Sequence, residues 1–239
     1  MTPSSAALAT ISSELTAWFV EMYDDLTALA DNTEKSIVRA RGKRSSLAEK
    51  DLKAVQTAAD TFLGKHHTPV AAGIIIRPGI VGDEGDIEWW KRGENGVSTR
   101  LLFTLAPQTA GFYDFETLEW FRNVIETGRP TLTGPYLDYA GMDDYILTMT
   151  VPFRLDGEIL GAAGCDIELR SLESALMPTL RRLDADAALV SQHGRIVLGN
   201  SGRFLVGNRV GDLPANGVSV DLSVHELGLK LVAVPRQGY

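Results

Sequence analysis

The sequence contains a single cysteine, Cys165, among its 239 residues. An intrachain disulfide is therefore impossible, and a cysteine-rich metal site is excluded. Because Cys165 falls on the apolar face of an expected strand, we interpret it as a small core residue.

A basic excess and a long apolar run are also missing. The formal net charge is -8, which argues against a nucleic-acid-binding surface. No stretch reaches the roughly 18 apolar residues that cross a bilayer. The first fifteen residues lack the basic segment and apolar run of a secretory signal. On these grounds we expect a cytoplasmic protein without membrane contact.

Motifs of common enzyme classes are absent as well. The sequence has no P-loop, no G-x-S-x-G and no H-E-x-x-H. The histidines give no base with an orienting partner, and we interpret the adjacent His66 and His67 as a surface turn. Four aspartates could meet a hard cation but lack the spacing of a calcium loop: Asp138, Asp143, Asp144 and Asp166. We therefore expect no catalysis, no cofactor and no metal.

The chain begins with helical patterns. Residues 9–30 carry a wide apolar face at helical spacing, which must dock on the domain or on a second copy of the chain. A capping box at 46–49 predicts a second helix that closes at Gly64. The basic run Lys35–Arg44 is typical of a solvated helix end or linker, and a phosphate or nucleic-acid site is the less favoured alternative.

Alternating and apolar runs predict a sheet in the middle of the chain. A helix around Leu118–Ile125 ends at Gly128, ahead of Pro130. Asp156-Gly157 indicates a type I′ hairpin. The expected strands are 70–77, 87–92, 99–105, 145–153 and 159–169.

The last part of the chain reads as a smaller β module. A helix over 171–183, kinked at Pro178, precedes two hairpins, one over 187–198 and one over 218–234. The predicted fold class is α+β, an antiparallel sheet with long N-terminal helices and a smaller second β module. The predicted segments are 1–64, 65–170 and 171–239.

The strand 159–169 places a carboxylate beside small residues. Asp166 follows Ala162 and Gly164 on one face, where an unpaired charge would be costly. Either a cationic group meets Asp166, or it lies in water or pairs with an arginine. Aromatic residues could wall such a site. Trp120 flanks a core or lines a pocket, and of Trp89 and Trp90 one faces each side of the sheet.

The order and spacing of these motifs resemble the Cache family, the PAS-like sensor domains of bacterial receptors, in its double-module form. The resemblance covers about 70–200 and rests on Trp120-Phe121, the 134–138 loop, the strand 148–152 and the 161–166 segment. It implies a pocket for a small metabolite, in which Leu118 stands where amino-acid-binding members carry an arginine. The residues that we expect to bind the ligand are Trp120, Phe121, Tyr136, Asp138, Asp166, Trp89, Trp90 and Tyr113.

From the resemblance we expect a small-molecule sensor that binds a cationic amine and signals to a separate partner. The long N-terminal helix would form a homodimer, as it often does in the family. One alternative is a carboxylate or amino-acid sensor that uses Arg92 or Arg100. Another is an enzyme or metabolic accessory protein on the same fold.

Overall fold

A computed structural model describes residues 4–44, 46–93, 96–138 and 144–236. In chain order its elements are α1 (Ser5–Arg41), η1 (Glu49–Lys53), α2 (Ala54–Lys65), β1 (Ala71–Ile76), β2 (Asp86–Lys91), β3 (Thr99–Arg100), η2 (Phe115–Thr117), α3 (Glu119–Thr127), β4 (Thr131–Asp138), β5 (Asp144–Leu155), β6 (Glu158–Glu168), α4 (Leu169–Leu180), β7 (Asp186–Val190), β8 (Ile196–Gly199), β9 (Val218–Asp221) and β10 (Lys230–Val234).

The predicted α+β class is confirmed, with one six-stranded and one four-stranded sheet. Contacts divide the chain into two compact units. The smaller is Met1–Glu21, Gly134–Tyr136 and Leu169–Tyr239, and the larger is Met22–Thr133 and Leu137–Glu168. None of the helices in the described residues has the length and apolar character needed to cross a bilayer.

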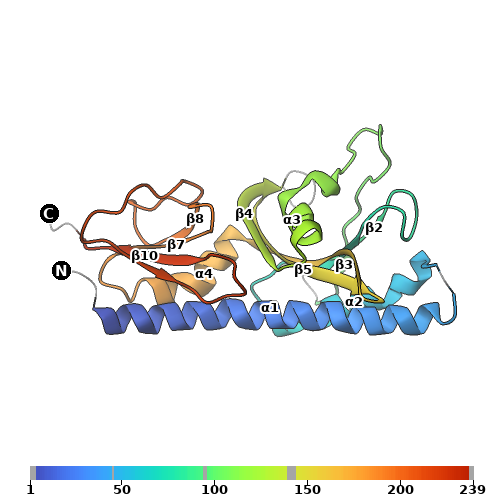
Figure 1. The fold of residues 1–239 in the computed structure, drawn as a ribbon, viewed down its shortest axis with the longest axis horizontal. Coiled ribbons are helices and arrows are strands. Elements are labelled where there is room, and N and C mark those ends of the chain that lie inside the picture. The colour runs from blue at the N-terminus through green and yellow to red at the C-terminus, as the bar shows by residue number, and fades with distance from the viewer. Residues whose placement is uncertain (1–3, 45, 94–95, 139–143, 237–239) are drawn as a thin grey trace. The chain divides into compact units, whose positions relative to one another are not determined.

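The larger unit is built on the six-stranded sheet, in the order β3-β2-β1-β6-β5-β4. The β1–β2, β1–β6 and β5–β6 pairs are antiparallel. Helix α3 covers one face of this sheet, and α2 with the second half of α1 covers the other (Figure 1). Asp156 and Gly157 both have positive φ, 52° and 87°, which confirms the predicted hairpin turn.

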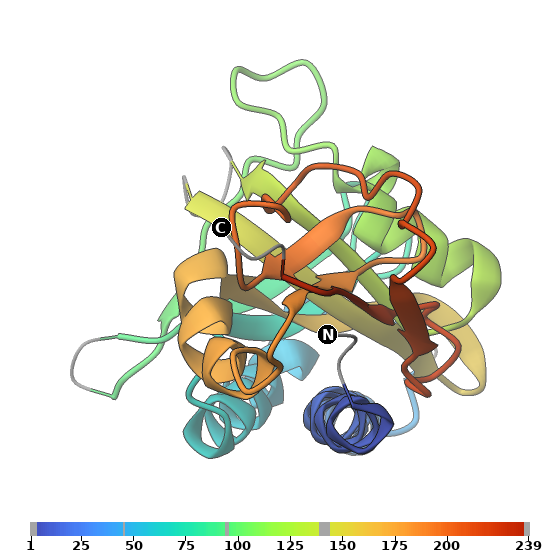
Figure 2. The same cartoon turned by 90° about the vertical axis from the view of Figure 1, so that its left-hand side faces the viewer.

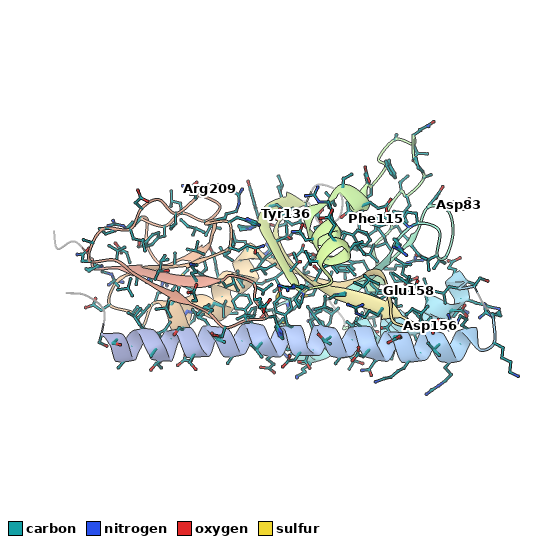
Figure 3. All side chains as sticks on the ribbon, in the orientation of Figure 1. Asp83, Phe115, Tyr136, Asp156, Glu158 and Arg209 are labelled. Atoms are coloured by element: carbon teal, nitrogen blue, oxygen red, sulfur yellow. The ribbon has the colours of Figure 1, made fainter. Side chains whose placement is uncertain are left out.

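Helix α1 is longer than predicted because the basic run continues it to Arg41. The end of the helix is tied to the β5–β6 hairpin, where the Arg41 guanidinium donates to both carboxylate oxygens of Asp156, at 2.7 and 3.0 Å. Asp156 and Glu158 lie at this tip in Figure 3. The basic run is therefore a helix end with a specific partner.

Two other boundaries differ from the sequence prediction. The capping box at 46–49 does not start the second helix. Asp51 instead accepts the Ala48 N–H and the Arg44 guanidinium, and η1 precedes α2. The expected strand 99–105 shrinks to the two residues of β3, because only Thr99 and Arg100 pair with β2.

Helix α3 ends as the sequence predicts. Gly128 is left-handed at φ 63°, and its N–H donates to the carbonyl of Val124. The helix begins at Glu119, after the short turn η2. Phe115 of that turn packs edge-on against Phe121, with ring centroids 5.0 Å apart. This contact fixes the end of α3 that carries Trp120.

The smaller unit holds the four-stranded sheet, in the order β8-β7-β10-β9. Helix α4 packs beside β8 (Figure 2) and contains Pro178, and it spans 169–180 where 171–183 was expected. Arg182 pairs with Glu14 of α1 at 2.6 Å. The core of this unit includes Ala188, Val190, Ile196, Phe204, Val232 and Val234.

Candidate ligand-binding site

Asp166 lies near the end of β6 with only 7% of its surface exposed. The Thr148 hydroxyl donates to its Oδ1 and the Trp89 indole N–H donates to its Oδ2, each at 2.7 Å. Both donors are neutral. In the described part of the chain, no basic side chain pairs with this carboxylate. In the described residues, Asp166 therefore neither pairs with an arginine nor lies exposed to water.

Trp89 reaches Asp166 across an intervening strand. Trp89 is on β2 and Asp166 on β6, with β1 between them. The β1 residues in this path are small, because Ala71 pairs with Asp166 and Gly73 pairs with Trp89. A Cβ at Gly73 would lie 1.9 Å from the carbonyl oxygen of Glu88, so this position requires glycine. The small β1 residues therefore let the indole cross the strand.

Helix α3 lies over the same face of the sheet. Thr150 is two residues from Thr148 on β5, so both side chains share a face. Its hydroxyl donates to the backbone carbonyl of Trp120 at 3.0 Å. The Trp120 indole nitrogen is buried and has no hydrogen-bond partner among the described residues. A buried N–H of this kind is costly unless a further group, such as a ligand, accepts from it.

Two more acidic groups, Asp138 and Tyr113, lie near Asp166. Burial raises the pKa of Asp166 to about 7, and the nearby charge of Asp138 adds to the rise against the lowering effect of Thr148 and Trp89. Burial also raises the pKa of Tyr113 well above its usual range, with contributions from Asp138 and Asp166. Tyr113 stacks on Phe103, with ring centroids 4.7 Å apart. The site is therefore negative when Asp166 is ionised.

The structure brings together Asp166, Asp138, Tyr113 and Trp89 from the predicted set. Phe121 is buried next to Trp120, at 5.8 Å between ring centroids. Tyr136 groups with the smaller unit and is half-buried (labelled in Figure 3).

Trp90 lies on the opposite face of the sheet, as the alternation of β2 requires. Its indole N–H donates to Glu88 at 3.0 Å. Glu88, Trp90 and Arg100 line a separate groove with residues of η1 and α2. Trp90 therefore does not share the face that carries Asp166.

Both arginines of the carboxylate alternative are engaged by oxygen atoms of the protein itself. Arg92 donates to the carbonyl oxygens of three residues at the end of α2 and beyond, Leu63, His66 and Pro69. Arg100 pairs with Asp86 and Glu88, at 2.9 and 3.0 Å. Both guanidinium groups are occupied by the protein itself.

Sequence reasoning missed Thr148 as a donor to Asp166. The register of the β5–β6 hairpin could have indicated it, because Thr148 lies directly opposite Asp166. Asp143 lies outside the described residues. Among the described residues, no group of three or more histidine, cysteine or acidic side chains could hold a metal ion.

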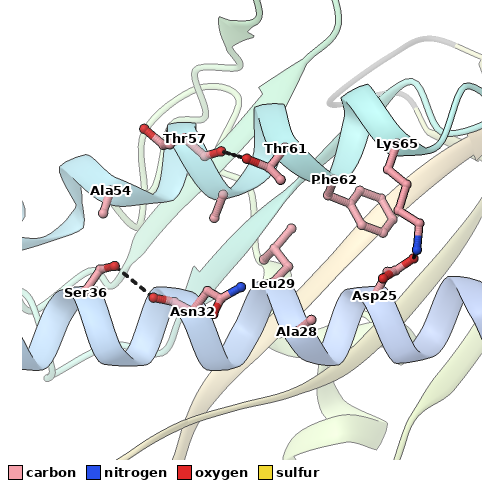
Figure 4. A pocket seen from close by; sticks show the side chains of 11 residues that line it. Asp25, Ala28, Leu29, Asn32, Ser36, Ala54, Thr57, Thr61, Phe62 and Lys65 are labelled. Carbon is pink, nitrogen blue, oxygen red and sulfur yellow. Dashed lines mark hydrogen bonds and ion pairs between the residues drawn. The ribbon is translucent and has the colours of Figure 1, made fainter.

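A cavity lies between α1 and α2, on the other side of the sheet. This groove has a volume of about 470 Å³ and is lined mainly by alanine, serine and threonine (Figure 4). Two of its hydroxyl groups are satisfied within their own helices: Ser36 donates to the Asn32 carbonyl and Thr61 to the Thr57 carbonyl. Its charged side chains, Asp25 and Lys65, pair with each other, which makes the groove a weaker candidate.

The interpretation of His66 as a surface residue is wrong. Its side chain is 10% exposed, and its Nε2 lies 2.6 Å from Oδ2 of Asp25 on α1. Lys65 pairs with the same carboxylate at 2.5 Å, at the end of the groove (Figure 4). The partner on α1 is 41 residues away in sequence, so no local pattern revealed it.

Comparison with known proteins identifies the type of domain. Residues 86–174 match the family model described as methyl-accepting chemotaxis protein-like, first PDC sensor domain. The methyl-accepting chemotaxis protein TlpQ of Pseudomonas aeruginosa is 28% identical over 82 residues, which are 34% of this chain and 11% of that receptor. The chain therefore corresponds to a small part of that receptor's length.

Solved structures share the fold over nearly the whole chain. The ligand-binding domain of the amino-acid chemoreceptor PctC of Pseudomonas aeruginosa PAO1, in complex with GABA, has a TM-score of 0.60 and 17% identity, and the match covers 96% of each chain. The extracellular domain of a histidine kinase has a TM-score of 0.56 and 14% identity, covering 98% of this chain and 96% of the other. The resemblance to Cache sensor domains is confirmed, and the matched descriptions are of sensor domains rather than enzymes.

The expectation of a cytoplasmic protein is wrong. The matched family model describes a sensor domain of chemotaxis receptors, and the histidine-kinase domain of the same fold is extracellular. The sequence argument failed because it relied on the absence of a signal and of an apolar run within this stretch of chain, and such absences do not locate a domain.

Proposed function

We propose that this chain is the ligand-binding part of a receptor, and that its ligand is a small cationic amine bound at Asp166. The observation that carries the proposal is a buried carboxylate with two neutral donors and no basic partner in the described residues. A buried charge is stable only when it is paired and its remaining hydrogen bonds are made. An ammonium group supplies both the charge and the donors.

The neighbouring groups suit the same guest. Asp138 adds negative charge on the approach to Asp166, and the Tyr113 hydroxyl lies close enough to both carboxylates to feel their charge. The face of an aromatic ring attracts a cation, by about 0.5–2 kcal/mol per contact. In this proposal Trp89 and Trp120 form apolar walls, and Phe121 supports Trp120 from behind. Tyr136 groups with the smaller unit and is not part of this proposal.

The occupied arginines disfavour a carboxylate-bearing ligand. Arg92 and Arg100 are held by protein oxygens, and Leu118 at the start of α3 cannot bind an anion. The indole N–H of Trp120, which has no partner among the described residues, can donate to an oxygen atom of the ligand. GABA, the ligand in the PctC structure, also carries an amino group, which agrees with an amine site on this fold.

We further propose that the domain lies outside the cytoplasm and passes the binding signal to a separate partner. The support is the family of the matched segment and the extracellular histidine-kinase domain of the same fold. Binding would shift the population of conformations that the partner reads.

A thermal-shift screen tests the ligand class. Methylamine, propylamine and ethanolamine are each compared with methanol, propanol and ethylene glycol, for the wild type and Asp166→Asn. We expect the amines alone to raise the Tm of the wild type, and the Asn variant to lose the effect, because a neutral amide does not pair with an ammonium. Asp83→Asn, at an exposed aspartate, is the matched control and should respond like the wild type. Equal stabilisation by amines and alcohols would refute the proposal.

A further inference from the structure

We infer that Asp166 carries a proton in the empty site and that the ammonium group of the ligand replaces it, so that the sensor responds to amine concentration and pH together. This inference rests on the proposed function, and it adds the identity of the group that occupies the site before the ligand arrives.

The geometry leaves two ways to neutralise Asp166. Its two hydrogen-bond donors, Thr148 and Trp89, are neutral, and each carboxylate oxygen accepts one bond from them. The residue is buried, so water does not stabilise the full charge as it would at the surface. No basic side chain of the described residues reaches the carboxylate. When no ammonium is bound, the remaining cation is a proton.

The titratable groups around Asp166 are mostly acids, and among them the charge of Asp138 raises the pKa of Asp166. Asp138 on β4 and Tyr113 before η2 are acids, and so is the thiol of the adjacent Cys165. Glu168 lies two residues along the same face of β6. Lys91 is the one base in this cross-strand row, separated from Asp166 by Ala71 of β1, and it forms no ion pair with Asp166 in the described structure. Burial and Asp138 together raise the pKa of Asp166 to about 7.

Binding of the ammonium group to the protonated site releases one proton to solvent. The protonated carboxyl group gives its proton to solvent, the carboxylate pairs with the incoming ammonium, and the ammonium keeps its own proton. Below the pKa of Asp166 the ligand must displace a proton, so its affinity falls as pH falls. Above that pKa the carboxylate is already ionised, and the affinity is constant until the amine itself loses its proton. From pH 8 to pH 6 we expect the Kd to rise about tenfold.

The ligand-free protein tests the proton itself. The Tm of the wild type and of Asp166→Asn is measured from pH 5 to pH 8. Asn resembles the protonated aspartate and does not ionise. We expect the Asn variant to gain stability relative to the wild type from pH 5 to about pH 7, and the difference to level off above that, because over this range Asp166 is protonated in the folded protein and ionised in the unfolded chain. Two profiles that run parallel across this range would overturn the inference.

A binding experiment with propylamine tests the replacement. Titration calorimetry in buffers of different ionisation enthalpy should give release of nearly one proton at pH 6 and almost none at pH 8 for the wild type. Thr148→Val removes the donor to Oδ1 and should move the midpoint of this pH dependence upward, whereas Thr148→Ser keeps the hydroxyl and should retain the wild-type midpoint. A Kd that is equal at pH 6 and pH 8 would overturn the replacement.

The two proposals fail in different ways. If the ligand-free Tm profiles diverge as expected but propylamine does not bind at any pH, the protonated Asp166 stands and the amine function is refuted, together with the exchange. If propylamine binds with the same Kd at pH 6 and pH 8, the amine function stands and the claim that Asp166 is protonated in the empty site is refuted.

Discussion

At the scale of single residues, the site depends on how the Asp166 carboxylate is oriented. One donor comes from β5 and one from β2, on opposite sides of β6. Hydrogen bonds to the ionised form favour it, by about 1.5–3 kcal/mol for a charged acceptor. These two bonds hold the carboxylate in place and limit the cost of ionising it, so the ligand does not have to supply every interaction.

Replacing Trp89 with phenylalanine should weaken amine binding. The variant keeps an aromatic wall but loses the indole N–H, so the pKa of Asp166 rises further and the ionised form becomes rarer. We expect the Kd for propylamine at pH 7 to rise about tenfold, measured by titration calorimetry. Trp90→Phe is the control, because that indole bonds to Glu88 on the opposite face of the sheet. A similar loss in both variants would mean that the effect is a general one on the sheet.

At the scale of elements, the small residues of β1 determine whether the site can form. Gly73→Ala should destabilise the protein by roughly 1–3 kcal/mol, because the new Cβ would lie 1.9 Å from a backbone oxygen of β2 and the strands must move apart. Denaturant unfolding measures the change. In Gly64→Ala nothing lies within 4 Å of the new Cβ, and alanine favours the α2 helix, so that variant should gain about 0.5–1 kcal/mol. Two equal losses would contradict the close packing at Gly73.

Helix α1 is connected to the edge strand β4 by a buried tyrosine. The Tyr23 hydroxyl is fully buried and donates to the Thr131 carbonyl at 2.8 Å. Tyr23→Phe leaves that carbonyl without its donor and should cost about 1–3 kcal/mol in denaturant unfolding. Tyr145→Phe, at a side chain that is 55% exposed, should change stability by less than about 0.5 kcal/mol. If Tyr23→Phe is equally neutral, the bond does not hold α1 to the sheet.

Much of the sheet could be predicted because its signals are local. The alternation of β5, the turn at Asp156-Gly157 and the glycine end of α3 each depend on neighbouring residues. The Asp166 face was predictable for the same reason, since small residues precede the carboxylate on one side of a single strand.

Features that depend on distant partners could not be predicted. The last residue of α1, Arg41, pairs with Asp156, which lies 115 residues away. The His66 side chain is mostly buried and lies against Asp25 of α1, 41 residues away. The sequence contains both members of each pair but does not show that they lie close together in the fold. For the same reason, the bonds from Arg92 to three backbone carbonyls could not be predicted.

At the scale of the whole molecule, two electrostatic effects of different range act on an amine. The net charge of -8 attracts cations through solvent, and salt screens this attraction with a Debye length of about 10 Å at 0.1 M. The buried pair with Asp166 is screened much less. Attraction at a distance governs how fast the ligand arrives, and the buried contact governs how long it stays.

Salt should therefore separate the two effects. Raising NaCl from about 0.05 to 0.5 M should slow association of propylamine several-fold and leave its dissociation rate nearly unchanged, as followed by stopped-flow tryptophan fluorescence. Uncharged propanol, run in the same series, controls for effects of salt on the fluorescence itself. A dissociation rate that rises in step with salt would place the ammonium at an exposed charge.

A crystal structure of the protein with bound propylamine tests the central claim most directly. We predict the ammonium nitrogen within hydrogen-bonding distance of an Asp166 oxygen, with the Trp89 and Thr148 bonds retained. An amine found only in the groove between α1 and α2, or at exposed carboxylates, with Asp166 still bonded to Trp89 and Thr148 alone, would contradict the account.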